Sequence, residues 1–258
     1  MNHIYKKINI SFSFIMLILL SFVSGLFKDI ICLFIVIIVH ELGHIITSLI
    51  CGWDIKKVDI SMCGGFITYN ENIDKPFIEE FLISISGIGM QIIFYAILTI
   101  LYNFGIIDLD TIVLFNKYNI SIFIFNILPI VPLDGSKIIN VLLNIYFPYK
   151  KSLKITNYIS ILTILLLILI FVILKFKIEF SYIIIITFII SKVIQMIKDV
   201  PYLFNRFLFE RYKKPIIRNK FNYIKDGNIN NMKRQVKNYF RINGKYYKEN
   251  DILRKRFD

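Results

Sequence analysis

The chain has 258 residues, of which 56% are hydrophobic, and it carries a formal net charge of +13. Its mean hydropathy of +0.64 is too high for an ordinary soluble domain, which is about 45–50% apolar and keeps a polar surface. The composition excludes a soluble globular enzyme, a disordered chain and a disulfide-stapled secreted module. It indicates an integral membrane protein.

Six apolar stretches approach or exceed the ~20 residues that a helix needs to cross a bilayer. They cover residues 11–27, 30–50, 81–104, 119–147, 156–175 and 180–197. Lys and Arg are enriched in alternate connections, and the positive-inside rule then places both termini in the cytoplasm. We expect an all-α polytopic membrane protein with a domain of six transmembrane helices over residues 1–197. A short basic cytoplasmic tail follows over residues 198–258.

The second stretch contains an HExxH motif, His40-Glu41-Leu42-Gly43-His44. Residues four apart share a helix face, so both imidazoles can bind one zinc ion, and Glu41 beside the metal can take a proton from water. A chance occurrence of the motif would bury three ionisable groups in hydrocarbon without compensation, which is costly. The sequence therefore predicts a catalytic zinc site with His40 and His44 as ligands and Glu41 as the base.

Residues 55–69 alternate between apolar and polar types around a Gly-Gly pair, which predicts a small membrane-associated β-hairpin. One interpretation is a plain connector between two spans. The other is an edge strand that pairs with an extended substrate, in which case Gly64, Gly65 and Phe66 contact that substrate.

Two prolines, Pro129 and Pro132, interrupt the fourth stretch, and the carbonyls freed there need partners. With the orientation above, His44 lies about 10 Å and Asp134 about 8 Å from the cytoplasmic face. Asp134 is therefore our candidate for the third zinc ligand; the alternative is an N-cap of the helix that restarts there. The Asn126 amide either stabilises the broken helix or binds the substrate backbone. We take Asn126 and Pro132 as substrate-binding candidates.

The combination of HELGH in one span of this chain and NILPIVPLDG in a later one resembles the intramembrane site-2 metalloproteases. Further matching segments are Trp53–Lys57, Gly64–Phe66 and Arg206–Tyr212, so the resemblance covers roughly residues 30–215. It implies that His40, His44 and Asp134 bind zinc and that Glu41 is the base. The chain departs from the family at Ser86–Gly89, where a Gly-Pro pair is usual; we interpret Gly87 and Gly89 as small residues that let helices pack closely.

The resemblance is to the branch of the family that removes the pro-sequence of a sporulation sigma factor in endospore formers. It implies a membrane-associated protein substrate, membrane inhibitor proteins as partners, and a location in the mother-cell membrane around the forespore. The alternative function is a non-proteolytic membrane metal-binding or transport protein. Glu41 discriminates between the two, because a transporter needs no base beside the ion.

Members of that branch end in a nucleotide-sensing CBS domain, and the residues after Pro215 are too few for a whole one. The segment is then a truncated CBS-like remnant or a docking surface for the precursor. We expect residues 228–241 to be helical, between turns at Asp226-Gly227 and Asn243-Gly244. Residues 198–258 hold 17 basic and 6 acidic residues, a net charge of +11, which favours anionic lipid over nucleic acid as a partner.

Overall fold

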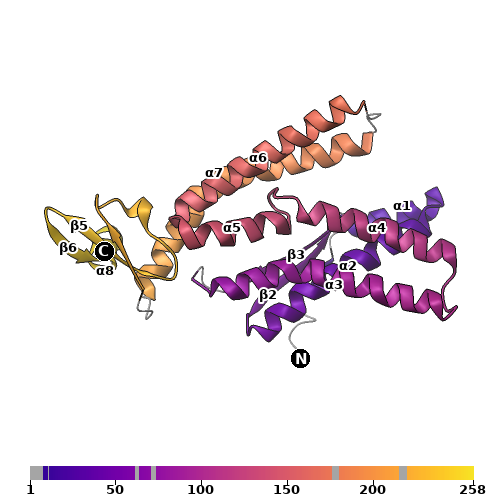
Figure 1. Ribbon diagram of the computed structural model, residues 1–258, viewed down its shortest axis with the longest axis horizontal. Helices are drawn as coiled ribbons and strands as arrows, with labels where there is room; N and C mark the ends of the chain where they lie inside the picture. The colour runs from indigo at the N-terminus through magenta and orange to yellow at the C-terminus, as the bar shows by residue number, and fades with distance from the viewer. Residues whose placement is uncertain (1–7, 11, 62–63, 71–73, 176–179, 215–219) are drawn as a thin grey trace. The chain divides into compact units, whose positions relative to one another are not determined.

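The computed structural model describes residues 8–10, 12–61, 64–70, 74–175, 180–214 and 220–258 (Figure 1). The chain divides into two compact units. The first comprises residues 1–71 and 81–127, and the second comprises residues 72–80 and 128–258. The long helix α3 (Phe77–Asn103) begins in the second unit and continues in the first.

The first unit contains α1 (Phe12–Ser24), α2 (Phe27–Ile50), most of α3, and α4 (Leu109–Ile127). The helices α2 and α4 pack against each other. The Tyr118 hydroxyl on α4 donates a hydrogen bond of 2.7 Å to Asp29 Oδ1 on α2. This contact satisfies the single acidic side chain in the first turn of α2, and it ties together two helices that are far apart in the sequence.

A three-stranded sheet accompanies these helices. The strands β2 (Ile55–Ser61) and β3 (Gly64–Tyr69) pair antiparallel, which confirms the hairpin predicted over residues 55–69. Residues 62–63 between them lie outside the described part of the chain. The strand β1 (Ile8–Ile10) adds to β2 in parallel, which the sequence did not predict. The strand order β1-β2-β3 leaves β3 at one edge of this sheet.

Three helices among the described residues are long and apolar enough to cross a membrane: α2, α3 and α6 (Tyr149–Ile173). They correspond to the spans predicted at 30–50, 81–104 and 156–175. Large apolar side chains of α6 are exposed, including Leu162, Leu165 and Val172. Such an apolar surface is typical of a helix that contacts lipid. The chain is an integral membrane protein, and crossing by the other three predicted spans stays a prediction.

The predicted fourth span is interrupted, as its prolines require. Helix α4 ends at Ile127, and α5 (Asp134–Tyr146) begins after a turn that contains a cis peptide bond between Val131 and Pro132. On α6, Ser160 Oγ accepts a hydrogen bond from the Val131 amide (3.1 Å) and donates one to the Pro129 carbonyl (3.2 Å). The backbone groups freed by the break are therefore satisfied by a side chain rather than left in hydrocarbon.

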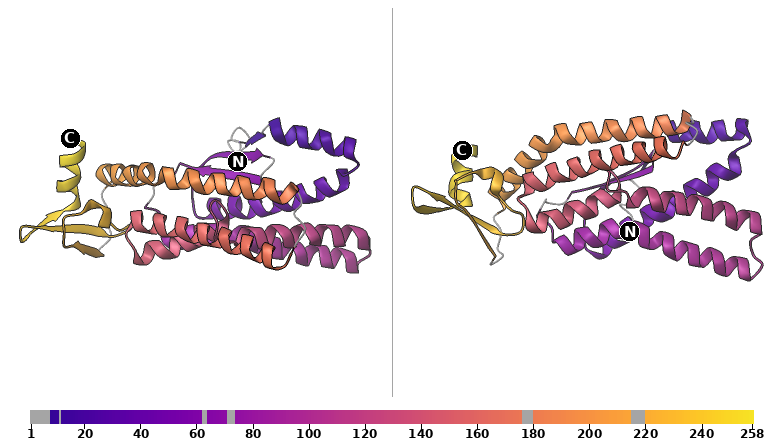
Figure 2. Two further views of the ribbon diagram at one scale, coloured as in Figure 1. Left: turned by 90° about the horizontal axis from the view of Figure 1, so that it is seen from above. Right: turned by 45° about the horizontal axis from the view of Figure 1, so that its top comes forward.

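In the second unit, α6 and α7 (Phe180–Lys213) lie side by side in all three views (Figures 1 and 2). Helix α7 continues well past the span predicted at 180–197. It is followed by β4 (Phe221–Ile224), the 3-10 helix η2 (Ile229–Asn231), β5 (Lys237–Ile242), β6 (Lys245–Lys248) and α8 (Glu249–Phe257). The strand β4 pairs in parallel with β5, and β5 pairs antiparallel with β6.

The helix expected over residues 228–241 is wrong. From Lys237 onward Asn238 and Phe240 are buried while the residues between them are less so, and this period of two belongs to a strand. The turn predicted at Asn243-Gly244 is confirmed: both residues have positive φ values, 49° and 78°, as the tight connection between β5 and β6 requires.

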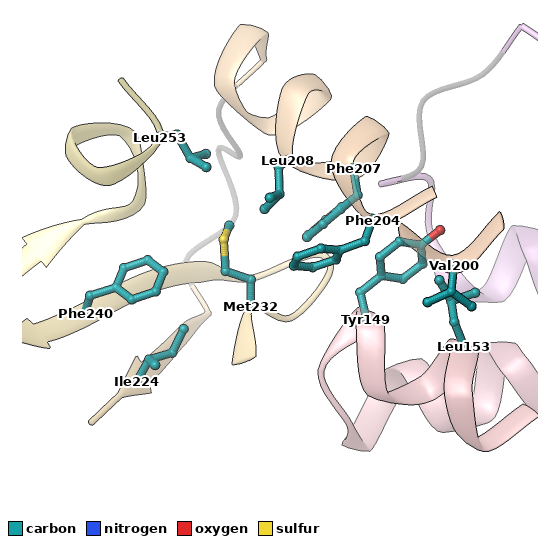
Figure 3. Close-up of a cluster of buried hydrophobic side chains, with 10 residues drawn as sticks. All are labelled: Tyr149, Leu153, Val200, Phe204, Phe207, Leu208, Ile224, Met232, Phe240 and Leu253. Carbon is teal, nitrogen blue, oxygen red and sulfur yellow. The ribbon is translucent and has the colours of Figure 1, made fainter. Parts of the chain in front are cut away.

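The C-terminal segment has its own core, which includes residues of α6 and α7 (Figure 3). Phe207 and Leu208 of α7 and Met232, Phe240 and Leu253 of the C-terminal segment are fully buried. Figure 3 shows Met232 and Leu208 between Phe240 on one side and Phe204 and Phe207 on the other. The residues predicted as a tail therefore form the end of α7 and a folded body that packs on it.

Two buried arginines of the second unit bind the segment that leads into α3. Arg211 on α7 lies 3.1 Å (Nε) from Asp74 Oδ2, and it donates hydrogen bonds to the carbonyls of Lys233 (3.0 Å) and Val236 (2.6 Å). The backbone N–H of Gln235 also donates to Asp74 Oδ1, at 3.1 Å. Both charged groups of this pair thus have partners inside the fold, as buried charges require.

Arg234 makes the second of these links. It forms a bidentate pair with the Glu80 carboxylate in the first turn of α3, and its guanidinium lies 5.2 Å from the centre of the Phe77 ring. Burial disfavours the charged guanidinium, but the hydrogen bonds to Glu80 outweigh this and raise the pKa of Arg234. This bidentate pair links the start of α3 to the C-terminal segment.

Candidate metal centre

The HExxH motif lies in the middle of α2, and its two histidines are buried, at 3% and 5% exposure. Their side chains are one helical turn apart on the same face. The Nε2 atoms of His40 and His44 are 3.2 Å apart, and the ring planes are nearly perpendicular, at 83°. The structure thus brings together the two imidazoles that the sequence predicted as zinc ligands.

The hydrogen bonds of the two rings assign their tautomers. His44 Nδ1 lies 2.6 Å from the Ile83 carbonyl oxygen, which can only accept, so Nδ1 carries the proton. His40 Nδ1 lies 3.2 Å from Gln91 Oε1 and likewise donates. In a neutral imidazole the other nitrogen then carries the lone pair, so Nε2 is the atom of both residues that is available to bind a metal ion.

The distance between these two nitrogens fits a zinc ion. Two lone pairs this close repel each other unless a shared proton or a metal ion lies between them. With Zn–N bonds of 2.0–2.1 Å and tetrahedral angles, two ligand nitrogens are about 3.3 Å apart. The separation of 3.2 Å agrees with that value without any movement of either side chain.

Close approach of α3 to α2 depends on two glycines. A Cβ at Gly43 would lie 2.5 Å from the Ser86 carbonyl oxygen. A Cβ at Gly87 would lie 2.5 Å from His44 Nε2 and 2.8 Å from His40 Nε2. The expectation of close helix packing therefore holds for Gly87, and this glycine also leaves space at the two Nε2 atoms. It is wrong for Gly89, because a Cβ there would meet nothing within 4 Å among the described residues.

The catalytic candidate Glu41 follows His40 and lies against the hairpin. A Cβ at Gly65 of β3 would be 2.6 Å from Glu41 Cδ and 3.1 Å from Oε1. The carboxyl group thus sits directly under the β3 backbone, beside the histidine pair. Gly64 and Phe66 flank Gly65 on the same strand, where they pair with Ser61 and Asp59 of β2.

The remaining predicted site residues lie around the break after α4. Asn126 Nδ2 donates to the Ile122 carbonyl at 3.1 Å, a contact that fits the helix-stabilising alternative. Pro132 is partly buried in the turn. The Asp134 side chain is 4% exposed and pairs with Lys137 Nζ at 2.7 Å. Its N-cap alternative is not supported, because the N-cap of α5 is Leu133 and no side chain caps the helix.

The sequence analysis missed two residues near the site. They are Gln91 and its hydrogen-bond partner Asn119. Gln91 is fully buried on α3 and is the sole amide in an otherwise apolar run, Gly89–Leu98. A buried amide is costly unless it is hydrogen-bonded, so a lone amide in this apolar run was a signal of a buried polar contact, although the sequence does not identify the partner.

Comparison with known proteins gives consistent matches. Residues 28–108 match Peptidase family M50. The chain is 31% identical to stage IV sporulation protein FB of Bacillus subtilis over 193 residues, which is 75% of this chain and 67% of the relative. It is 30% identical to a zinc metalloprotease of Methanocaldococcus jannaschii over 128 residues, 48% of this chain and 37% of the relative.

The fold has a solved counterpart. A site-2 protease from Methanocaldococcus jannaschii superposes with a TM-score of 0.56 and 24% identity, over 73% of this chain and 89% of that chain. The match extends the likeness beyond the motif to the arrangement of the helices. The buried HExxH histidines, their zinc-compatible geometry and these relatives agree: the chain belongs to peptidase family M50, the site-2 protease family of zinc metalloproteases.

Proposed function

We propose that the chain cleaves a membrane-associated precursor protein within or beside the membrane. The observation that carries this proposal is the 3.2 Å separation of the two histidine Nε2 atoms, with both Nδ1 atoms committed to α3. When bound, a zinc ion supplies a Lewis acid that polarises the scissile carbonyl and lowers the pKa of water. Glu41, next to His40 on α2, takes the proton from the attacking water and delivers it to the leaving amine.

We propose Asp134 as the third ligand. A catalytic zinc takes three protein ligands and keeps one open position. Two observations support the choice: all three side chains are buried, and the depths estimated from the sequence for His44 and Asp134 agree within one helical turn.

The substrate-binding role proposed for the hairpin rests on its place in the sheet. The strand β3 is an edge strand, and Gly65 brings its backbone against Glu41. An extended peptide that adds to this edge would present its carbonyls beside the base. Gly64, Gly65 and Phe66 would supply the pairing backbone. Asn126 at the end of α4 and Pro132 in the turn after it would contact the peptide.

The proposed substrate is the pro-sequence of a sporulation sigma factor, which rests on the similarity to the sporulation protein of Bacillus subtilis. We also propose that residues 1–197 cross the membrane six times and that both termini lie in the cytoplasm. The similarity further suggests a location in the mother-cell membrane around the forespore. The basic residues of 198–258 would contact anionic lipid. The depth estimates place the cut near the cytoplasmic face.

Co-expression with a candidate sigma precursor tests this proposal. We expect a shortened product whose new N-terminus maps within or next to the membrane segment on the cytoplasmic side, and no product after zinc chelation. A cut that maps to the opposite face would overturn the proposed orientation. An intact precursor in the presence of zinc-loaded enzyme would overturn the proposed substrate.

A further inference from the structure

Helix α3 presents one continuous side to the histidine pair. Ile83, Gly87 and Gln91 are spaced four residues apart and therefore lie on one face of the helix. Each acts differently: the Ile83 carbonyl accepts from His44 at 2.6 Å, Gly87 leaves space at the two Nε2 atoms, and Gln91 accepts from His40 at 3.2 Å. His44 is thus oriented by backbone, and His40 is oriented by a side chain.

The Gln91 amide is itself held in one orientation. Its Nε2 donates to the Asn119 carbonyl at 3.3 Å, and Asn119 Nδ2 donates back to the Gln91 carbonyl at 3.2 Å. Because the Asn119 carbonyl can only accept, it selects the NH₂ side of the Gln91 amide. Oε1 must then face His40, where it can only accept from Nδ1.

We propose that Gln91 is a positioning residue for zinc: it fixes the tautomer and ring angle of His40, with Asn119 as its anchor on α4. The proposal rests on the proposed metal site and deepens it. A wrong tautomer would place the proton on Nε2 and remove the lone pair that binds the ion. Partners of this kind around metal ligands typically change metal affinity by 10–100-fold when mutated.

Three variants of the full-length protein in detergent test the role, with zinc affinity measured by chelator competition. Gln91→Met removes the acceptor and keeps the length of the side chain, and we expect 10–100-fold weaker zinc binding. Gln91→Asn keeps an amide but withdraws its oxygen from His40, and we expect a similar loss. Gln91→Glu retains an acceptor and should restore most of the affinity. Thr99→Val, two turns further along α3, is the control and should bind zinc as the wild type does.

Two further measurements separate positioning from simple stabilisation. The visible spectrum of the cobalt-substituted protein should change in Gln91→Met, because the geometry at His40 changes. The melting temperature should fall less in the metal-free form of Gln91→Met than in its zinc-loaded form. Unchanged zinc affinity and cobalt spectrum in Gln91→Met would overturn the inference. A wild-type protein that binds no zinc would instead overturn the proposed metal site.

Discussion

Gly87 offers a sharp test of the metal centre, because its Cα faces both metal-binding nitrogens. In Gly87→Ala the new Cβ would lie 2.5 Å from His44 Nε2 and 2.6 Å from His40 Cε1. Ordinary van der Waals contact begins at 3.4 Å, so His44 Nε2 would have to move by about 0.9 Å in a close-packed interior. Metal–ligand distances tolerate only about 0.2 Å. We therefore expect zinc affinity to fall by at least about 100-fold.

The chain supplies a matched control two residues away. A Cβ at Gly89, on the same helix, would meet nothing within 4 Å. Both alanines gain up to about 1 kcal/mol of helix propensity over glycine, so Gly89→Ala should fold at least as stably and bind zinc normally. The assay is zinc content after purification, followed by chelator competition. A Gly87→Ala protein that holds one zinc with wild-type affinity would refute the close approach of α3 to the two metal-binding nitrogens.

Further predictions concern the base, the third ligand and the C-terminal segment. Gly65→Ala should push the Glu41 carboxyl aside and lower kcat about 100-fold with zinc retained, as single-turnover cleavage and metal analysis would show. Asp134→Ala should lose zinc as well as activity; full occupancy in metal analysis would exclude it as a ligand. Arg234→Met should cost about 3–5 kcal/mol by removing the bidentate partner of the partly buried Glu80 carboxylate, whereas the double change Arg234→Met with Glu80→Leu should recover most of the lost thermal stability.

Features of the fold that depend on residues close together in the sequence could be predicted from the sequence. The HExxH spacing predicted the histidine pair because four residues make about one helical turn. The Gly-Gly pair between alternating residues predicted the hairpin, and the prolines predicted the break before Asp134. Each of these inferences depends on residues within one turn or one strand of each other.

Contacts between residues far apart in the sequence could not be predicted from it. Nothing near Gln91 in the sequence says that its amide meets His40, which lies 51 residues away. In the same way Arg234 meets Glu80 across 154 residues, so a segment that has the composition of a basic tail is a folded body bound to the start of α3. The strand β5 was taken for a helix because its charged residues concealed the alternation of buried Asn238 and Phe240.

The central claim, that this chain is a zinc protease with Glu41 as its base, is tested most directly by zinc content and precursor cleavage measured together in Glu41→Gln. The amide keeps the size of the side chain and leaves the histidine ligands in place, but it cannot accept the proton. We predict zinc occupancy equal to that of the wild type and no detectable product. Cleavage by the zinc-loaded variant at a rate close to that of the wild type would contradict the claim.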